Sequence, residues 1–326
     1  MLPDHLQKFA TPQPVLNGQG HIVLIDVMGD DARVADAART SYQSNAALRE
    51  ARDTGEDATL IRQLLRDRHT NPFEHAHLTL HVRCPMDVWR LWIWHQTASV
   101  SEYSTRYKEA IDDALKTDPD TWRSQSKNNK QGSAGWVTEW PEGYRVEKDD
   151  YMEFVSTPGG GRINVANVGQ YLSLREMFLQ HKAREVYEER LAFGIAREQA
   201  RKDLPLSTMT EAVWTIDLHN LFHFLSLSLR LDPHAQQEIR EYATVITQIV
   251  EAWCPATWAA FKDWRLEAVT FSGPEIRSLR ALLGEISNET NAREISAIGV
   301  RDALYKGEIY PSELLDFLRK LGLETP

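Results

Sequence analysis

Alternating apolar and polar positions predict two β-strands in the first quarter of the chain. Residues 20–28, GHIVLIDVM, place β-branched side chains between glycines, which is typical of a buried strand. Residues 74–83, EHAHLTLHVR, alternate apolar and polar side chains, as a strand with one buried face does. We therefore expect one sheet that contains both segments.

Helical patterns dominate the rest of the first third. Asp30 and Asp31 form an N-terminal helix signal directly before ARVADAARTSY. Residues 45–68 show helical periodicity together with i,i+4 charge pairs, and His69 to Pro72 interrupts that pattern. Pro85 is expected to open a further helix that runs to about residue 96.

The second half of the chain is predicted to be mainly helical. Residues 171–201 are predicted to form a charged helix rich in Glu, Arg and Ala, which Pro205 interrupts. Residues 208–230 are predicted to form an apolar helix, and residues 233–265 another. The tail, residues 271–326, contains short amphipathic segments and is expected to be a helical extension of a catalytic domain that spans residues 1–270.

Residues 111–170 are the least regular region. They contain the polar stretch RSQSKNNKQGSAGW and the glycine-rich turn STPGGGRIN. We interpret them as long active-site loops rather than as a linker between independent domains. The three glycines at 159–161 are not followed by the Lys-Ser/Thr of a phosphate loop, so a flexible turn is the better interpretation.

Composition and charge limit the class of protein. An apolar fraction of 42% and ten tryptophans are typical of a globular protein. The net charge of −10 argues against general nucleic-acid binding but leaves room for a small anionic ligand held by local arginines. The longest apolar runs are shorter than the roughly 18 residues of a membrane span. With two cysteines and no signal-peptide pattern, a cytoplasmic location is expected.

Three alternating histidines, His75, His77 and His81, would lie on one face of the predicted strand. Imidazole nitrogens at such a spacing can bind a metal ion, as in a metal-dependent hydrolase. The alternative is a set of hydrogen-bonded strand histidines, and we favour it because no cluster of cysteines or carboxylates at ligand spacing accompanies them. We therefore predict no metal site.

Residues 95–107, HQTASVSEYSTRY, carry seven hydroxyl side chains directly after the apolar run VWRLWIW. Ser104 is not part of a Gly-x-Ser-x-Gly elbow, so a binding role is favoured over a nucleophilic one. Arg106, Arg201 and Arg230 each stand beside apolar or hydroxyl-rich sequence. Each fits a structural ion pair when taken alone, but together they suggest a site for a phosphorylated ligand.

The same stretch resembles the signature of the flavin-dependent (ThyX-type) thymidylate synthases, Arg-His-Arg-x-x-Ser-x-Asn-Glu-x-Ser-x-Arg. The matching residues are His95, Ser99, Glu102, Ser104 and Arg106. Further segments similar to that family follow in order at residues 38–42, 69–75, 123–133, 200–206, 214–225 and 230–243. The resemblance covers roughly residues 20–265. It implies an α+β fold in which a mixed sheet packs against a helical layer.

The resemblance also implies an activity. Members of the family methylate carbon 5 of a uracil nucleotide, with FAD as the cofactor, methylenetetrahydrofolate as the carbon donor and NADPH as the reductant. Flavin and nucleotide share a pocket at the subunit interfaces of a homotetramer. Uracil nucleotide and folate are therefore the expected partners, and neither nucleic acid nor a membrane is expected.

Site residues follow from the same resemblance. The expected flavin-binding residues are Asn71, Trp94, His95, Gln96, Glu102, Asp217, His219 and His223. The expected nucleotide-binding residues are Leu91, Trp94, Glu102, Tyr103, Ser104, Thr105, Arg106, Arg201 and Arg230. Arg230 aligns with the arginine that contacts the uracil ring and promotes its activation, so it is the expected catalytic residue.

Four positions depart from the usual pattern. Trp94 and Gln96 stand where the signature has arginine, Ser101 replaces its asparagine, and Leu91 stands where many members carry glutamine. The segment before Arg230 is also two residues longer than usual, which leaves the register of that arginine open. Three hypotheses remain: a methylase of UMP and dUMP from the nucleoside-antibiotic branch, an ordinary dUMP-specific synthase, and a catalytically inactive nucleotide-binding homologue.

Overall fold

A computed structural model describes residues 2–40, 54–127, 130, 132–142, 167–228 and 235–279. The chain divides into two compact units, Met1–Leu266 and Glu267–Pro326. In the second unit the description covers a helix over residues 273–279, and the other helical segments expected in the tail lie outside the described residues. All elements named below belong to the first unit.

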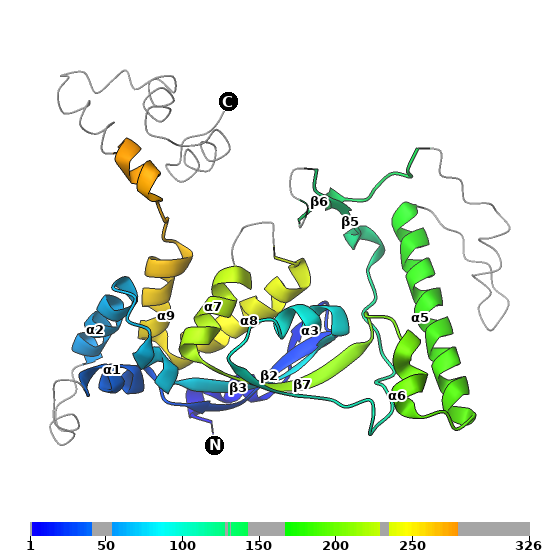
Figure 1. Cartoon of the computed structure of the whole chain (residues 1–326), viewed down its shortest axis with the longest axis horizontal. Helices are drawn as coiled ribbons and strands as arrows, with labels where there is room; N and C mark the ends of the chain where they lie inside the picture. The colour runs from blue at the N-terminus through cyan, green and yellow to red at the C-terminus, as the bar shows by residue number, and fades with distance from the viewer. Residues whose placement is uncertain are drawn as a thin grey trace. The chain divides into compact units, whose positions relative to one another are not determined.

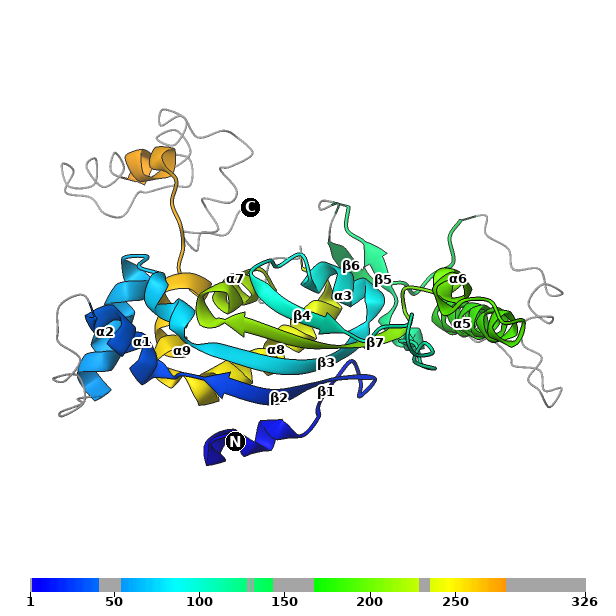
Figure 2. The same cartoon turned by 60° about the horizontal axis from the view of Figure 1, so that its bottom comes forward.

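A five-stranded sheet with the strand order β1-β2-β3-β7-β4 runs through the first unit (Figure 2). Its strands are β1 (Gln13–Val15), β2 (Gly20–Met28), β3 (His77–Pro85), β4 (Ala98–Glu102) and β7 (Met209–Asp217). The expected α+β fold is confirmed. All pairings between the neighbouring strands are antiparallel rather than mixed. This agrees with the alternation in the sequence, because antiparallel strands commonly bury only one face whereas parallel strands bury both.

The alternation of side chains decides which face of the sheet is buried. In β3, Leu78, Leu80 and Val82 are buried, and the residues between them are only partly covered. In β7, Trp214 and Ile216 are buried on the same face, opposite Leu80 and Leu78 respectively. One face of the sheet therefore belongs to the core, and the other carries the polar members of each strand.

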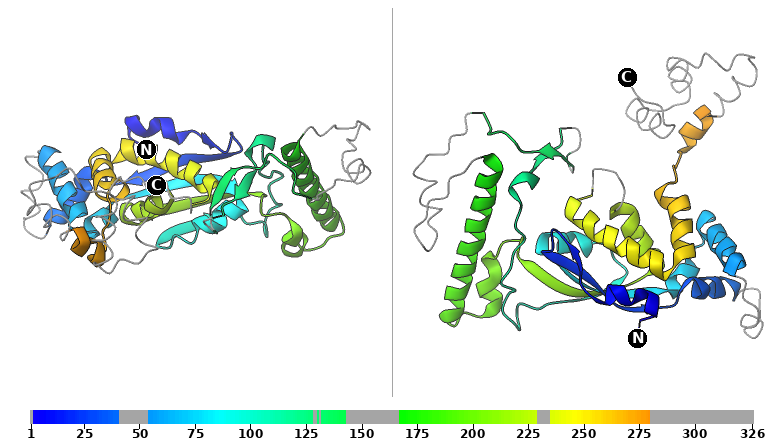
Figure 3. Two further views of the ribbon diagram at one scale, coloured as in Figure 1. Left: turned by 90° about the horizontal axis from the view of Figure 1, so that it is seen from above. Right: turned by 180° about the vertical axis from the view of Figure 1, so that it is seen from behind.

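Three helices cover the apolar face (Figure 1, Figure 3). They are α3 (Met86–Trp92), α7 (Leu218–Ser228) and α8 (Gln237–Trp253). The buried ring of Trp92 stands at their junction: its centroid lies 5.2 Å from that of Trp214, 5.0 Å from Phe224 and 5.5 Å from Tyr242. Aromatic side chains from a strand and three helices therefore form the centre of the core.

The remaining elements flank this core. At the end near α9 (Pro255–Phe261) lie α1 (Asp31–Arg39) and α2 (Thr54–Arg66), and α9 continues into a short π-helix, η5 (Lys262–Leu266). At the other end α5 (Val168–Ala192) packs against α6 (Arg197–Ala200) (Figure 1). Short elements complete the list: η1 (Asp4–Ala10), η2 (Asn71–His75), η3 (Pro119–Thr121), η4 (Arg201–Asp203), and the ribbon of β5 (Arg123–Gln125) and β6 (Ser133–Trp136).

Local signals located several elements correctly. The strand at 20–28 is confirmed, and so is the helix signal at Asp30, whose side chain accepts a hydrogen bond from the backbone N–H of Arg33 at 2.9 Å. The helix that follows Pro85 ends at Trp92, earlier than expected. The strand expected at 74–83 begins only at His77, because η2 occupies the preceding residues.

The helix expected over residues 208–230 is wrong in its first half. Residues 209–217, MTEAVWTID, form the central strand β7, and the helix begins only at Leu218. Their buried positions recur at every second residue from Thr210 to Ile216, which is the period of a strand. The segment expected as one helix over 233–265 is divided at Cys254, where Pro255 starts α9.

Candidate active site

The signature stretch lies along the outermost strand of the sheet order. β4 pairs with β7, with Ala98 opposite Ile216 and Glu102 opposite Ala212. Thr97, with a left-handed φ of 67°, turns the chain from the end of α3 into the strand. The signature is thus divided into a turn, a strand and a following loop, and its side chains are distributed over both ends of β4.

One group of predicted residues gathers at the end of β4 that follows Glu102. The carboxylate of Glu102 accepts a hydrogen bond of 2.8 Å from the hydroxyl of Thr210 on β7. The chain then turns at Ser104, whose carbonyl accepts from the backbone N–H groups of Tyr107 and Lys108 at 3.2 and 3.1 Å. This turn carries the next two predicted residues, Thr105 and Arg106.

Arg201 joins this group from a segment 96 residues away. Its guanidinium donates a hydrogen bond to the hydroxyl of Thr105, which is buried. Arg106 is mostly exposed and lies 3.4 Å from a carboxylate oxygen of Glu198 on α6. The structure therefore brings two arginines, a buried hydroxyl and a carboxylate together. Arginines and hydroxyls are suited to bind a phosphate.

Packing between α5 and α6 fixes the position of Arg201. The buried side chain of Tyr187 on α5 packs with Ala110 and Ala200, and its hydroxyl accepts from the backbone N–H of Ala110 at 3.0 Å. Arg190 of α5 donates to the carbonyl of Ala200 at 3.1 Å and pairs with Asp203 at 2.5 Å. The turn that carries Arg201 is consequently held on both sides.

A second group lies at the other end of β4. The ring of His95 is 4.9 Å from that of Phe224 and 6.1 Å from that of His223, both on α7. Burial, and secondly the neighbouring His223, lower the pKa of His95. The imidazole is therefore neutral at pH 7. A neutral imidazole has one nitrogen that donates a hydrogen bond and one that accepts, so it can bind an uncharged ring of a ligand.

A cavity of about 180 Å³ adjoins this second group. His219 and His223 line it from α7, and His69 and Thr70 line it from the segment before η2. Asn71 is the exposed first residue of η2, directly after Thr70. Histidines from α7 and from the 69–75 segment thus line one cavity, and Asn71 does not line it.

Some predicted residues have other surroundings. The buried carboxylate of Asp217 accepts from the backbone and side-chain amides of Asn220 at 2.9 and 2.6 Å, so it caps α7. Tyr103 donates its hydroxyl hydrogen to the carbonyl of Glu109 at 2.8 Å. The side chains of Leu91, Trp94 and Gln96 are exposed near the end of α3, and Trp94 is 76% exposed. Arg230, the predicted catalytic residue, lies outside the described residues.

Sequence reasoning missed two basic residues of the 180 Å³ cavity, Arg68 and Arg265. Arg68 directly precedes the 69–75 segment, so its neighbourhood was indicated although its role was not. Arg265 is in η5, and no local pattern marks it. Its place in the cavity depends on the packing of α9 and η5 against α2, which only the tertiary structure reveals.

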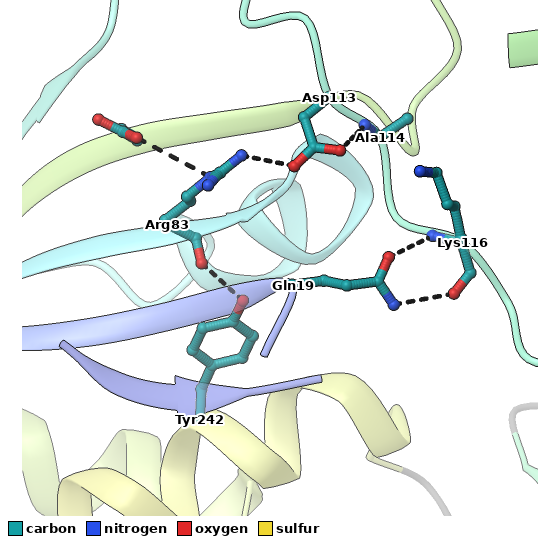
Figure 4. Close-up of polar contacts among 7 residues, drawn as sticks. Gln19, Arg83, Asp113, Ala114, Lys116 and Tyr242 are labelled. Carbon is teal, nitrogen blue, oxygen red and sulfur yellow. Dashed lines mark hydrogen bonds and ion pairs between the residues drawn. The ribbon is translucent and has the colours of Figure 1, made fainter. Parts of the chain in front are cut away.

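The segment that leads away from the signature is tied to the start of β2 and to the last residues of β3 (Figure 4). Arg83 at the end of β3 pairs with Asp113 at 2.6 Å, and its carbonyl accepts from the hydroxyl of Tyr242 at 2.7 Å. The side chain of Gln19 bonds both the backbone N–H and the carbonyl of Lys116, at 2.8 and 3.0 Å. Gly20 permits this arrangement, since a Cβ there would lie 2.0 Å from the Tyr242 hydroxyl.

A second cavity, of about 250 Å³, lies between this segment and α5, lined among others by Asp113, Lys116 and Arg184. None of the predicted site residues lines it. Of the three histidines considered for a metal, His77 and His81 are on β3, but His75 ends η2, so they do not share one face. His81 lies 3.4 Å from Glu211, and no group of three potential ligands among the described residues is placed to hold a metal ion.

Comparison with known proteins identifies the class to which this fold and site belong. The family model described as thymidylate synthase complementing protein matches residues 23–256. The chain therefore belongs to the flavin-dependent thymidylate synthase family, and it is an enzyme of the methyltransferase type. No helix among the described residues is long and apolar enough to cross a membrane.

Individual relatives carry related names. The chain is 38% identical over 287 residues to the flavin-dependent thymidylate synthase of Thermus thermophilus, covering 88% of this chain and 90% of the relative. It is 42% identical over 265 residues to that of Treponema pallidum, covering 81% and 76%. Among solved structures, the UMP/dUMP methylase PolB from Streptomyces cacaoi bound with 5-Br dUMP matches with a TM-score of 0.61 at 29% identity, over 75% of this chain and 95% of that one.

Proposed function

We propose that this protein methylates carbon 5 of a uracil nucleotide with FAD as cofactor, methylenetetrahydrofolate as carbon donor and NADPH as reductant, in a catalytic domain of residues 1–270. The observation that carries this proposal is the convergence of Thr105, Arg106 and Arg201 beside the signature strand. The names of the family and of the related proteins support a flavin-dependent methylation of a uracil nucleotide.

The phosphate end of the nucleotide is assigned to the group that follows β4. Arg201 is half-buried and already oriented by Thr105, so it offers a fixed cation with little loss of side-chain freedom on binding. Arg106 is exposed, and exchanging Glu198 for a phosphate would replace a solvated ion pair by a charge-assisted contact. Glu102, oriented by Thr210, accepts hydrogen bonds from ring or sugar donors.

The flavin is assigned to the group around His95 and the adjoining cavity. That cavity has apolar aromatic walls, with Phe222 and Phe261 stacked at 4.1 Å, and basic residues at its border. An aromatic wall suits a planar ring system and the basic residues suit phosphates, so the residues present fit a flavin dinucleotide. The flavin supplies the hydride, while the protein orients the reactants and excludes water.

Arg230 is assigned to the uracil ring. A guanidinium near the ring oxygens favours the form in which negative charge develops there, an effect that contributes a few kcal/mol at preorganised sites, about 3 kcal/mol for one donor. Arg230 follows α7 in the sequence, and α7 carries the flavin-side histidines. Its assignment rests on the resemblance of residues 214–243 to the family.

We further propose a homotetramer whose sites combine residues of different subunits. The two groups lie at opposite ends of β4, and five extended residues span roughly 17 Å. The mostly exposed side chain of Arg106 can face a second chain in such an assembly. Light scattering on the flavin-loaded protein measures the mass directly, and a stable monomer with bound FAD would contradict the tetramer.

Both cysteines are buried free thiols, which fits the proposed cytoplasmic location.

The reaction is tested with the purified protein. We expect a yellow protein with flavin absorbance that, given NADPH and methylenetetrahydrofolate, releases tritium from carbon 5 of a labelled uracil nucleotide. A colourless protein that takes up no added FAD would refute the flavin assignment. Flavin binding without tritium release would instead favour the inactive nucleotide-binding homologue, which the replacement of two signature arginines by Trp94 and Gln96 motivates.

The sugar preference is a separate prediction. We propose that the enzyme accepts UMP as well as dUMP, as the name of PolB says of that protein. Ser101 on β4 is exposed and smaller than the asparagine of the signature, and its hydroxyl can donate to or accept from the 2′-hydroxyl. We expect kcat/KM for the two nucleotides to differ by less than about a thousandfold, roughly 4 kcal/mol.

A variant tests the stated cause of that preference. Ser101→Asn restores the signature residue, and we expect it to shift the ratio of kcat/KM toward dUMP without changing FAD affinity. Val100→Ala, at the neighbouring exposed position on the other face of β4, is the matched control. A wild-type preference for dUMP above about a thousandfold would identify an ordinary dUMP-specific synthase.

A further inference from the structure

Two arginines from distant segments meet at the 180 Å³ cavity. Arg68 follows α2, and Arg265 lies on η5 after α9. They share the cavity with His219 and His223, to which the resemblance assigns flavin contacts. Neither arginine belongs to the signature or to the residues assigned above, so their presence there requires its own explanation.

The charges of these two arginines are not neutralised by neighbours. Close by on the same elements, Arg62 pairs with Asp263, and Arg66 pairs with Asp67 at 2.8 Å. Within the described part of the chain, by contrast, neither Arg68 nor Arg265 forms an ion pair with a carboxylate. Burial, and secondly the charge of Arg68, lower the pKa of Arg265. Two guanidiniums held near each other without an anion repel, and an anion between them would remove that cost.

The lining of the cavity extends the same pattern. Besides the two arginines it contains three histidines, His69, His219 and His223, and no acidic residue among those described. Phe73, Phe222 and Phe261 provide its apolar wall. A cavity with cations and an aromatic wall matches a ligand that joins phosphate groups to a planar ring.

The backbone at Arg68 is consistent with a functional position. Its φ of 60° lies in the left-handed region, at the end of α2 where glycine or asparagine is usual. The backbone N–H of His69 donates to the carbonyl of Leu64 at 2.9 Å, which closes the helix at this residue. A residue other than glycine in this backbone conformation is strained and needs compensation from its surroundings. Such residues are concentrated at ligand sites.

We propose that Arg68 and Arg265 form a phosphate-binding pair that holds the diphosphate of a dinucleotide at this cavity. The inference rests on the proposed function, whose cofactor FAD and reductant NADPH both contain such a diphosphate. FAD is the favoured ligand, because the neighbouring His219 and His223 are assigned to the flavin. The pair would then add two residues to the flavin site. Each guanidinium offers a planar pair of donors to phosphate oxygens.

Ligand binding tests the pair. The protein is freed of flavin, and the affinities for FAD and riboflavin are measured by flavin fluorescence in wild type, Arg68→Gln, Arg265→Gln and the double variant. We expect each single change to weaken FAD binding about 10-fold and the double change about 100-fold, as expected for lost charge-assisted contacts. The affinity for riboflavin, which has no phosphate, should change less than about 3-fold. Inorganic diphosphate should compete with FAD for binding to wild type but not to the double variant.

Arg66→Gln is the matched control, because it removes the same charge from an exposed arginine two residues from Arg68 that does not line the cavity. Unchanged FAD affinity with a KM for NADPH raised about 10-fold or more would support the pair and assign it to the reductant's diphosphate. Unchanged values for both ligands would overturn the pair. An equal loss of FAD and riboflavin affinity would also overturn it, because phosphate recognition would then not be the cause.

Thermal stability separates binding from folding. Because the two guanidiniums repel in the ligand-free protein, Arg265→Gln should leave the Tm of that form unchanged or raise it. A Tm lowered by several degrees would assign Arg265 a structural role and overturn the proposal. The proposed function fails separately: it is refuted when wild type binds neither FAD nor riboflavin. The pair alone is refuted when wild type and variants have equal FAD affinity and equal KM for NADPH.

Discussion

Arg201→Ala is expected to lower kcat/KM for the nucleotide about 100-fold, roughly 3 kcal/mol, while FAD affinity stays within about 2-fold of wild type. The substitution removes a half-buried cation from the proposed phosphate site. It also leaves the buried hydroxyl of Thr105 without its donor, which adds the cost of an unsatisfied polar group. Steady-state kinetics with the preferred nucleotide and FAD titration measure the two effects.

Arg197→Ala is the control for this prediction. Arg197 starts the same short helix, α6, and is exposed, so its removal changes the charge by the same amount without affecting Thr105. We expect it to change kcat/KM less than about 3-fold. Loss of FAD affinity in Arg201→Ala, with nucleotide kinetics unchanged, would mean that the two halves of the site have been assigned in reverse.

Trp92→Ala is expected to lower the free energy of unfolding by about 3–5 kcal/mol. The indole is fully buried and contacts aromatic rings from β7, α7 and α8. Alanine would leave a cavity at the junction of the helical layer and the sheet, and the rigid rings around it can fill that cavity only in part. Urea denaturation followed by tryptophan fluorescence and circular dichroism measures the loss.

Trp94→Ala provides the matched comparison two residues further along the chain. Its side chain is 76% exposed, so we expect a change in unfolding free energy below about 0.5 kcal/mol. The same substitution should nevertheless weaken ligand binding, because Trp94 is assigned to both flavin and nucleotide. Equal destabilisation by the two substitutions would contradict the described packing of α3.

Local sequence patterns predicted part of this fold, but they did not predict a strand that pairs with strands far away in the sequence. β2 and the start of α1 were identified because glycines and an aspartate cap mark their ends in the sequence. β7 was not, because its strand period is followed without interruption by the apolar helix α7. The strand is selected by its partners: β3 pairs with it on one side and β4 on the other, and neither is near it in sequence.

The candidate site shows the same division. The resemblance indicated Thr105, Arg106 and Arg201 as nucleotide residues, and the fold brings these three together although Arg201 lies on a separate helix turn. Arg265 carried no signal, since its relation to Arg68 depends on how η5 packs beside α2. Motifs identify residues whose neighbours are fixed by sequence order, whereas charge pairs between elements appear only after folding.

The position of β4 at the end of the sheet order has a consequence for how this enzyme diverges from its relatives. Four of its five residues are exposed, while the neighbouring β7 carries the buried side chains that stabilise the fold. Exposed positions tolerate substitution with little effect on stability. The strand that carries the signature can therefore acquire new side chains, such as Ser101, without repacking of the core. Under the proposed function, a substitution on β4 that changes substrate preference would therefore cost little folding stability.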